Sequence, residues 1–532
     1  MLFNSLEFIL AFVPITLLGF YLLGERGHER AAVVWVVLAS LFFYAWWDPG
    51  EHQPTDPWRW WPLGLICSSV VLNYLVGQQL LARPSKAGLA AGVAVNLASI
   101  GFFKYAGFFV NDVARLSFDL SYVLLPLAIS FFTFQQIAYL VDAYRGAVRG
   151  EGFVNYALFV TFFPQLIAGP IVHHSETIPQ FARRETYRAN LDNLSLGISI
   201  FVIGLAKKVV LADGIATYAT PVFAAAQAGA DPTLFEAWGG ALAYTFQLYF
   251  DFAGYSDMAI GLGLMFNIRL PINFDSPYKA VNIVDFWRRW HITLSRFLRD
   301  YLYIPLGGSR LGPSRRYTNL MITMLLGGLW HGAAWTFVIW GGLHGVYLVI
   351  NHAWHGLRRR LGHDLSRSTW LGRVAARSIT FLAVVVAWVY FRAEDFDAAN
   401  RILAGMLGLN GVQLPASYHG LLGPLAPTLD ALGWVFQDAD GFHFHGVNQV
   451  IFLLALFGVA FLLPNTQEWT GYIAPNADRA PAAAPSLFGR LAAALPRWRP
   501  NLVHGSLLGA VLCWCLLAAF AQTPSEFLYF QF

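Results

Sequence analysis

The sequence predicts an all-α polytopic membrane protein, and three observations carry that prediction. Of the 532 residues, 57% are hydrophobic and only 12% are charged. The mean hydropathy is +0.50, which a water-soluble domain of this size would not tolerate. Apolar stretches of about 17 to 25 residues recur along the chain, and this length matches the roughly 30 Å hydrocarbon core of a bilayer. We therefore expect roughly eleven to thirteen transmembrane helices.

The apolar stretches divide the chain in order. The first of them, MLFNSLEFILAFVPITLLGFYLL, has no basic segment and no small-residue cleavage site, so we expect a retained anchor helix. The expected spans lie at about residues 1–23, 31–47, 62–82, 87–103, 122–141, 153–172, 195–212, 235–266, 317–350, 376–391, 448–464 and 503–521.

Polar segments interrupt these spans without marking separate domains. Residues 48–60 and 405–447 are rich in Pro, Gly and polar residues, which predicts loops at the membrane surface. Residues 474–500 form a Pro/Ala-rich linker with room for one short amphipathic helix. We find no solenoid repeat and no convincing similarity between the halves, so residues 1–532 are predicted to form a single membrane domain.

Charge and cysteine content exclude several partners. The formal net charge is only +4, so no nucleic-acid partner is implied. Basic residues gather in loops, as expected for cytoplasmic connections. The cysteines, Cys67, Cys513 and Cys515, lie in apolar segments without metal-ligand spacing, which predicts packing residues with no disulfide and no metal site. The basic groups are Arg183–Arg184, Arg315–Arg316 and Arg358–Arg360.

The segment from Asn319 to Asn351 contains no acidic or basic residue except His331 and His344. Polar groups at membrane depth are rare and tend to line a cavity or a substrate path, because no water is present to satisfy them. Placing a neutral imidazole at membrane depth costs less free energy than placing a full charge there. The ordinary pKa of histidine, near 6.5, also suits proton transfer. His331 is therefore a candidate functional residue, and a histidine that merely bonds to a neighbouring helix is the alternative.

Residues Val284 to Tyr303, VDFWRRWHITLSRFLRDYLY, predict a basic amphipathic helix at the membrane interface. At helical spacing, His291 falls on an apolar stripe and should point into the protein. The arginines on the remaining face have two interpretations, contact with lipid phosphates or binding of an anionic cofactor. The aromatic face comprises Phe286, Trp290, Thr293, Phe297 and Tyr301, with Trp287, His291, Leu294, Leu298 and Leu302 beside it.

Further polar groups lie within apolar segments. Residues 243–266 contain two carboxylates, Asp251 and Asp257, which demand partners or a wet cavity. Upstream, TFFPQLIAGPIV carries Gln165 and a Gly169–Pro170 break, and broken polar helices line pathways in membrane proteins. Helix-to-helix hydrogen bonding is the alternative for Gln135 and Gln165.

The motifs of common enzyme classes are absent from the sequence. It contains no G-x-S-x-G elbow, H-E-x-x-H zinc site, Walker loop or G-x-G-x-x-G fingerprint. Two buried histidines suit a simpler scheme, in which one takes a proton from an incoming hydroxyl and the other positions a reactant. That scheme fits acyl transfer to an alcohol, while proton-coupled transport or transport of a polysaccharide or lipid-linked sugar remains open.

The sequence resembles the membrane-bound O-acyltransferases, and among them the bacterial alginate O-acetylase branch. The similarity covers nearly the whole chain and is strongest in its centre, in LYFDFAGYSDMAIGLGLMF (248–266), FWRRWHITLSRFLRDYLYIPLGG (286–308) and MLLGGLWHGAAWTFVIWGGLHG (324–345). The resemblance extends to FFKYAGFF (102–109), LPLAISFFTFQQIAYLVDAYRG (125–146), FFPQLIAGPIV (162–172) and GLAKKVVLAD (204–213).

The resemblance implies a helical bundle around a central funnel or tunnel, with a catalytic core at about residues 243–352. It implies that His331 in GLWHGA is the catalytic histidine and that His291 in RRWHITLS is the second catalytic residue. We expect neighbouring residues to line the donor or substrate pathway. These residues are Trp330, Gln247, Asp251, Ser256, Asp257, Trp287, Trp290, Arg288, Arg289, Arg296, Arg299, Trp335 and His344.

The resemblance also implies a reaction and its participants. Acetyl-coenzyme A would serve as the donor from the cytoplasmic side of a bacterial inner membrane, in contact with membrane lipid. A periplasmic or membrane-anchored acetyltransferase would pass the acetyl group to an exported polysaccharide of the alginate or cellulose type. The chain departs from the alginate branch at 48–60, at 405–447 and in its FLYFQF end, which leaves the polymer open. An acyltransferase acting on a lipid or protein alcohol is the alternative.

Overall fold

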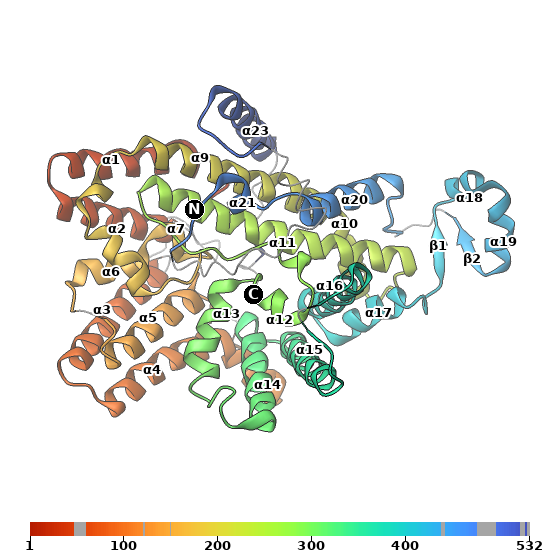
Figure 1. Ribbon diagram of the computed structural model, residues 1–532, viewed down its shortest axis with the longest axis horizontal. Helices are drawn as coiled ribbons and strands as arrows, with labels where there is room; N and C mark the ends of the chain where they lie inside the picture. The colour runs from red at the N-terminus through yellow and green to blue at the C-terminus, as the bar shows by residue number, and fades with distance from the viewer. Residues whose placement is uncertain are drawn as a thin grey trace.

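The computed structural model describes residues 1–46, 60–120, 123–148, 150–365, 367–437, 442–475, 496–521 and 527–528. The described chain is predominantly helical and contains only two short strands, which confirms the predicted all-α class (Figure 1). Its first half contains α1 (Val13–Glu25), α2 (Glu29–Ala45), α3 (Trp61–Ala82), α4 (Lys86–Ile100), α5 (Ile129–Tyr144), α6 (Phe153–Thr161), α7 (Phe163–Leu166), α8 (His174–Phe181), α9 (Leu191–Ala206), α10 (Asp213–Gln227) and α11 (Leu234–Met265).

The second half adds shorter helices and one small sheet. The α-helices are α12 (Ile283–Trp287), α13 (Ile292–Leu298), α14 (Gly312–His331), α15 (Trp335–Arg360), α16 (Trp370–Arg392), α17 (Phe396–Met406), α18 (Ser417–Leu422), α19 (Ala426–Ala431), α20 (Val447–Leu462), α21 (Thr466–Thr470) and α23 (Leu502–Ala521). The π-helical turns are Phe8–Phe12, Gly101–Tyr105, Phe108–Val113, Lys207–Ala212 and Arg299–Tyr303, and the 3₁₀ turns are Arg184–Tyr187, Pro277–Lys279 and Gly423–Leu425.

The long helix α11 runs through the middle of the molecule (Figure 1) and is buried along nearly its whole length. Its first turn is closed by a capping box between Thr233 and Glu236. Along its length α11 packs closely on α9, because Gly254 and Gly261 face Gly204 and Gly197. A Cβ at any of these glycines would come within 2.7 Å of the opposite backbone. Small residues therefore allow the two backbones to approach, as in other membrane helix pairs.

Six helical stretches among the described residues are long and apolar enough to cross a membrane. The predicted count of eleven to thirteen spans is therefore not confirmed, whereas multiple membrane crossings are. Several expected spans are divided into pieces: residues 153–172 form α6, α7 and an irregular end, and 317–350 form α14 and α15. The six stretches are Phe8–Glu25, Trp61–Ala82, Lys86–Tyr105, Leu191–Gln227, Trp370–Arg392 and Leu502–Phe520.

The prediction of one continuous helix from Val284 to Tyr303 is wrong. The chain forms α12, breaks at residues 288–291 and resumes as α13. His291 stands at the break with a left-handed φ of 42°, a conformation that ends the first helix and redirects the chain. The inward position predicted for His291 is nevertheless confirmed, because its side chain is fully buried.

Residues 405–447 were predicted to be a surface loop, but part of this segment is ordered. We call residues 412–436 the lobe, which protrudes from the helical body at one end of the molecule (Figure 1). Two parallel strands, β1 (Val412–Leu414) and β2 (Trp434–Phe436), pair with Val412 opposite Trp434, and α18 and α19 connect them.

Two other predicted polar segments fall mainly outside the described residues. Almost all of the 48–60 loop and most of the 474–500 linker lie outside the residues that the structure describes. Of the FLYFQF end, Phe527 and Leu528 are described, and both are buried. Phe527 stacks on Tyr255 with ring centroids 4.7 Å apart, so this part of the chain lies against α11.

Candidate active site

The end of α14 presents His331 inside the protein, where the side chain is only 4% exposed. The helix stops there because Gly332 adopts an extended conformation, and α15 starts three residues later. A Cβ at residue 332 would overlap the ring of Phe337, so only glycine fits this turn. The tight turn between α14 and α15 therefore sets the position of the imidazole.

A lysine from another helix holds this end of α14. The Lys104 ammonium donates hydrogen bonds to the carbonyl oxygens of Trp330 and His331, at 2.6 and 2.9 Å. The neighbouring Tyr105 hydroxyl donates to the carbonyl oxygen of Leu329 at 2.8 Å. The last carbonyls of a helix have no partners within the helix, and a cation at that end also complements the helix dipole. Sequence reasoning missed Lys104, although a charge inside FFKYAGFF was the available signal.

Three histidines predicted from two separate segments of the sequence meet in one row of rings. His291 neighbours Trp330 at 6.2 Å between ring centroids, and Trp330 neighbours His331 at 4.8 Å. The row continues from His331 to Trp340 at 4.9 Å and from Trp340 to His344 at 4.8 Å. We call these five residues the histidine–tryptophan row.

The far end of the row contains a buried polar group. Neither ring nitrogen of His344 has a hydrogen-bond partner among the described residues. A buried polar nitrogen without a partner costs about 1–3 kcal/mol, so such a group calls for an explanation.

At the other end of the row, a polar network fixes His291. Its Nδ1 lies 3.2 Å from the side-chain oxygen of Asn273. The same oxygen accepts hydrogen bonds from the Thr293 hydroxyl at 2.7 Å and from the Thr293 backbone N–H at 3.3 Å. Because a backbone N–H can only donate, the Asn273 atom that it contacts must be the side-chain carbonyl oxygen. An oxygen of this kind only accepts, so Nδ1 of His291 must carry the ring proton. Nε2 is then the basic nitrogen, and Asn273 is a site residue that sequence reasoning missed.

The two buried carboxylates of α11 have basic partners, as the sequence required. Asp251 pairs with Lys208 at 2.7 Å, and Asp257 pairs with Lys207 at 2.6 Å. Sequence reasoning did not identify these lysines as the partners, because they lie on another helical segment. Ser256 accepts a 3.4 Å hydrogen bond from Asn273, which connects α11 to the His291 network.

The predicted arginines do not form one cluster. Arg289 pairs with Asp285 at 2.8 Å, Arg296 with Glu176 at 2.7 Å, and the exposed Arg299 with Asp300 at 2.7 Å. Arg288 is exposed. Three of the four guanidinium groups already have carboxylate partners, which weakens the expectation that they hold an anionic donor.

The remaining predicted residues differ in their distance from the row. Trp287 contacts His344 with centroids 5.1 Å apart, whereas Trp290 stacks on Phe286 at 5.7 Å. Trp335 is 47% exposed and lies on the surface, away from the buried row. Gln247 is buried, and its side-chain oxygen has no hydrogen-bond partner in the described part of the chain.

The chemistry available at this site is that of imidazole in an aromatic interior. Within the described ranges, no group of three His, Cys, Asp or Glu side chains is placed to hold a metal ion. A neutral histidine can accept a proton from a hydroxyl group and later return it. The site therefore suits proton transfer during attack by an alcohol.

Comparison with known proteins agrees with this chemistry. Residues 143–392 match the membrane-bound O-acyltransferase family, MBOAT. The chain is 46% identical to a peptidoglycan O-acetyltransferase of Helicobacter pylori, over 78% of this chain and 81% of the relative. It is 38% identical to a probable alginate O-acetylase of Pseudomonas aeruginosa over the full length of both. A teichoic acid D-alanyltransferase of Streptococcus thermophilus is 28% identical over 50% of this chain and 68% of the relative. The chain therefore belongs to the membrane-bound O-acyltransferase family and is an acyltransferase.

Proposed function

We propose that this acyltransferase moves acetyl groups from cytoplasmic acetyl-coenzyme A across a bacterial inner membrane for O-acetylation of an exported polysaccharide. The observation that carries the proposal is the position of His331, at the end of a broken helix and joined through Trp330 to His291. The similarity to a peptidoglycan O-acetyltransferase and to a probable alginate O-acetylase supports acetyl as the group and a polysaccharide as the final acceptor.

The histidine positions suggest how the transfer proceeds. His331 takes the proton of the attacking hydroxyl, whose oxygen forms a bond to the acetyl carbonyl carbon. The carbon–sulfur bond of the thioester breaks, and the proton passes to the departing thiolate of coenzyme A. His291 carries its ring proton on Nδ1, which faces Asn273, so its Nε2 can accept a hydrogen bond that orients a reactant. Because the bilayer core is about 30 Å thick, the donor and the acceptor must reach this site from opposite faces.

The function is tested with the purified protein in lipid nanodiscs and acetyl-coenzyme A labelled in the acetyl group. Alginate, cellulose and peptidoglycan fragments are offered as acceptors, alone and with a candidate extracytoplasmic acetyltransferase. We expect label on one polysaccharide. Label that appears only on a lipid or protein alcohol would contradict a polysaccharide acceptor and favour the alternative acyl acceptor class.

The lobe is our candidate docking surface for the acetyltransferase partner. Arg358–Arg360 end α15, and a basic helix end is typical of the cytoplasmic face. From this side α16 runs 23 residues, about 34 Å, to Arg392, after which α17 leads to the lobe. The lobe then lies on the opposite, extracytoplasmic side. Exposed leucines there offer an apolar contact, namely Leu421, Leu425 and Leu432.

Replacing these three leucines by serine is expected to lower polysaccharide acetylation in cells at least tenfold, because a few apolar anchors carry most of an interface's energy. Thioester cleavage by the isolated protein should change less than twofold. The measurements are acetyl content of the polymer and coenzyme A release. The matched control replaces Leu311 and Leu361 by serine, because these leucines are similarly exposed but lie near the basic residues at the end of α15 and the start of α14. Normal polymer acetylation by the triple variant would contradict docking at the lobe.

Lys104→Met is expected to lower kcat about tenfold to a hundredfold with little change in KM. Two hydrogen bonds from an ammonium group to the end of α14 would be lost, each worth about 1.5–3 kcal/mol. His331 would then leave its working position. Lys104→Arg should recover part of kcat, because a guanidinium still donates. Tyr105→Phe, which removes one neutral hydrogen bond, is the milder comparison. Equal loss of folded protein and of activity would assign Lys104 a purely structural role.

A further inference from the structure

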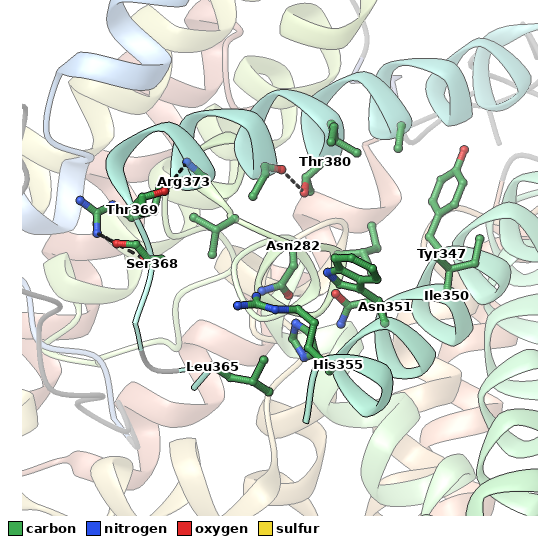
Figure 2. Close-up of a pocket in the computed structure, with 18 of the residues that line it drawn as sticks. Asn282, Tyr347, Ile350, Asn351, His355, Leu365, Ser368, Thr369, Arg373 and Thr380 are labelled. Atoms are coloured by element: carbon green, nitrogen blue, oxygen red, sulfur yellow. Dashed lines mark hydrogen bonds between the residues drawn. The ribbon is translucent and has the colours of Figure 1, made fainter. Parts of the chain in front are cut away.

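A groove lies between the second half of α15 and the first half of α16 (Figure 2), and none of its lining residues belongs to the histidine–tryptophan row. Its volume is about 870 Å³, and Asn282, which precedes α12, contributes to its floor. Figure 2 shows Arg373, Thr369 and Ser368 at one end and Tyr347 and Ile350 at the other. The groove is therefore formed by α15, α16, the described residues 365 and 367–369 between them, and residues 281–283.

One end of the groove is cationic. Arg358, Arg367 and Arg373 line it, and its described lining residues include no carboxylate. Arg373 donates to the carbonyl oxygen of Ser368 at 3.1 Å, which holds its guanidinium at the mouth. Arg367 is mostly exposed and lies 3.4 Å from Asp364 outside the groove. This end therefore presents excess positive charge to a ligand, chiefly from Arg358 and Arg373.

The other end of the groove is apolar and opens sideways. Ile350 is 60% exposed and Ile379 is 68% exposed, so one flank has no protein cover among the described residues. Ile350 and Arg358 are eight positions apart on α15, which places the apolar wall about 12 Å deeper along the helix than the arginine. If the arginines lie at the lipid headgroups, these isoleucines lie at the depth of the acyl chains.

We propose that this groove binds one anionic phospholipid from the cytoplasmic leaflet. Its phosphate would lie between Arg358 and Arg373, because guanidinium groups bind phosphate in a bidentate manner. Its acyl chains would follow Ile350 and Ile379. Basic pockets between membrane helices on the cytoplasmic side are typical sites for such headgroups. A soluble acyl donor that carries phosphate groups would bind the cationic end, but it would leave the apolar flank that opens into the bilayer without a contact.

The site connects to the catalytic region through one residue. Tyr347 lines the inner end of the groove, and its ring lies 5.7 Å from that of His344. A bound lipid would therefore stabilise the α15 segment that carries the end of the histidine–tryptophan row. The binding itself does not depend on the proposed acetyl transfer.

Native mass spectrometry of the purified full chain tests the proposal. The protein is partly delipidated and then given phosphatidylglycerol or phosphatidylcholine with identical acyl chains. We expect one retained phosphatidylglycerol per chain and at least a tenfold preference over phosphatidylcholine. Arg358→Gln with Arg373→Gln should reduce that preference nearly to unity, since each arginine near a headgroup contributes about fivefold. Arg359→Gln with Arg360→Gln, which are neighbouring cations that do not line the groove, should keep it.

A second variant and a competitor complete the test. Ala383→Trp fills the apolar part and leaves the arginines unchanged, so it should also release the lipid. Equal retention of both lipids by the wild-type protein would overturn the proposal. Displacement of phosphatidylglycerol by acetyl-coenzyme A would overturn it in favour of a donor site. These measurements report lipid binding and require no turnover, so their outcome is independent of whether the protein acetylates a polysaccharide.

Discussion

His331→Ala is expected to lower the rate of acetyl transfer by about 10²–10⁴, because it removes the base that accepts the hydroxyl proton. Donor binding should stay within a few fold of wild type, since a proton acceptor acts mainly in the transition state. The side chain sits at the end of α14 among aromatic rings, so the smaller residue leaves the helix ends in place. Single-turnover acetyl transfer and donor binding are measured separately on the purified variant.

Two other histidines serve as comparisons. His291→Gln should retain measurable activity, because an amide can still hydrogen-bond to Asn273 and to a reactant. His363→Ala changes an exposed histidine beyond the end of α15 and should behave as wild type. Near-normal turnover by His331→Ala would remove the catalytic assignment and leave the buried histidine a structural role.

The fold class could be predicted from composition and the length of apolar stretches, but the number of spans could not. Hydropathy averages over a window, so it does not register the stop at Gly332. The irregular chain around Gly169 and Pro170, in contrast, agrees with the break that these two residues predict. Gly332 lies inside a stretch whose only acidic or basic side chains between Asn319 and Asn351 are His331 and His344. What ends α14 is the shape of Phe337 packed against Gly332, a tertiary contact that no local pattern contains.

The site was predicted in part, and the failures have physical causes. A lone charge-capable residue in an apolar segment is visible in sequence, which is why His331 and His344 were found. The inward direction of His291 was predicted from a helical stripe, yet it results from a left-handed residue at a helix break. Asn273 and Lys104 could not be assigned, because their roles depend on neighbours 18 and 226 positions away in the chain.

Replacement of Lys208 is expected to have the largest effect on stability, because this residue also depends on a partner that is distant in the sequence. This residue pairs with Asp251 at 2.7 Å and with Asp213 at 2.9 Å, and the Asp251 side chain is 1% exposed. Lys208→Met should destabilise the folded protein by about 3–5 kcal/mol, because an unpaired carboxylate would remain buried. Lys208→Met combined with Asp251→Asn should recover most of this loss, since the buried charge is removed along with its partner.

Unfolding of each purified variant by a denaturing detergent measures these differences. Arg299→Met breaks an ion pair of the same length, 2.7 Å, in which the arginine side chain is 60% exposed. That control should change stability by about 0–1 kcal/mol, because solvent screens an exposed pair. If Lys208→Met is no more destabilising than Arg299→Met, Asp251 is neutral in the folded protein and the pair is not ionic. A double variant as unstable as Lys208→Met would instead locate the loss in packing around α11 or in the broken Asp213 pair, rather than in the buried Asp251 charge.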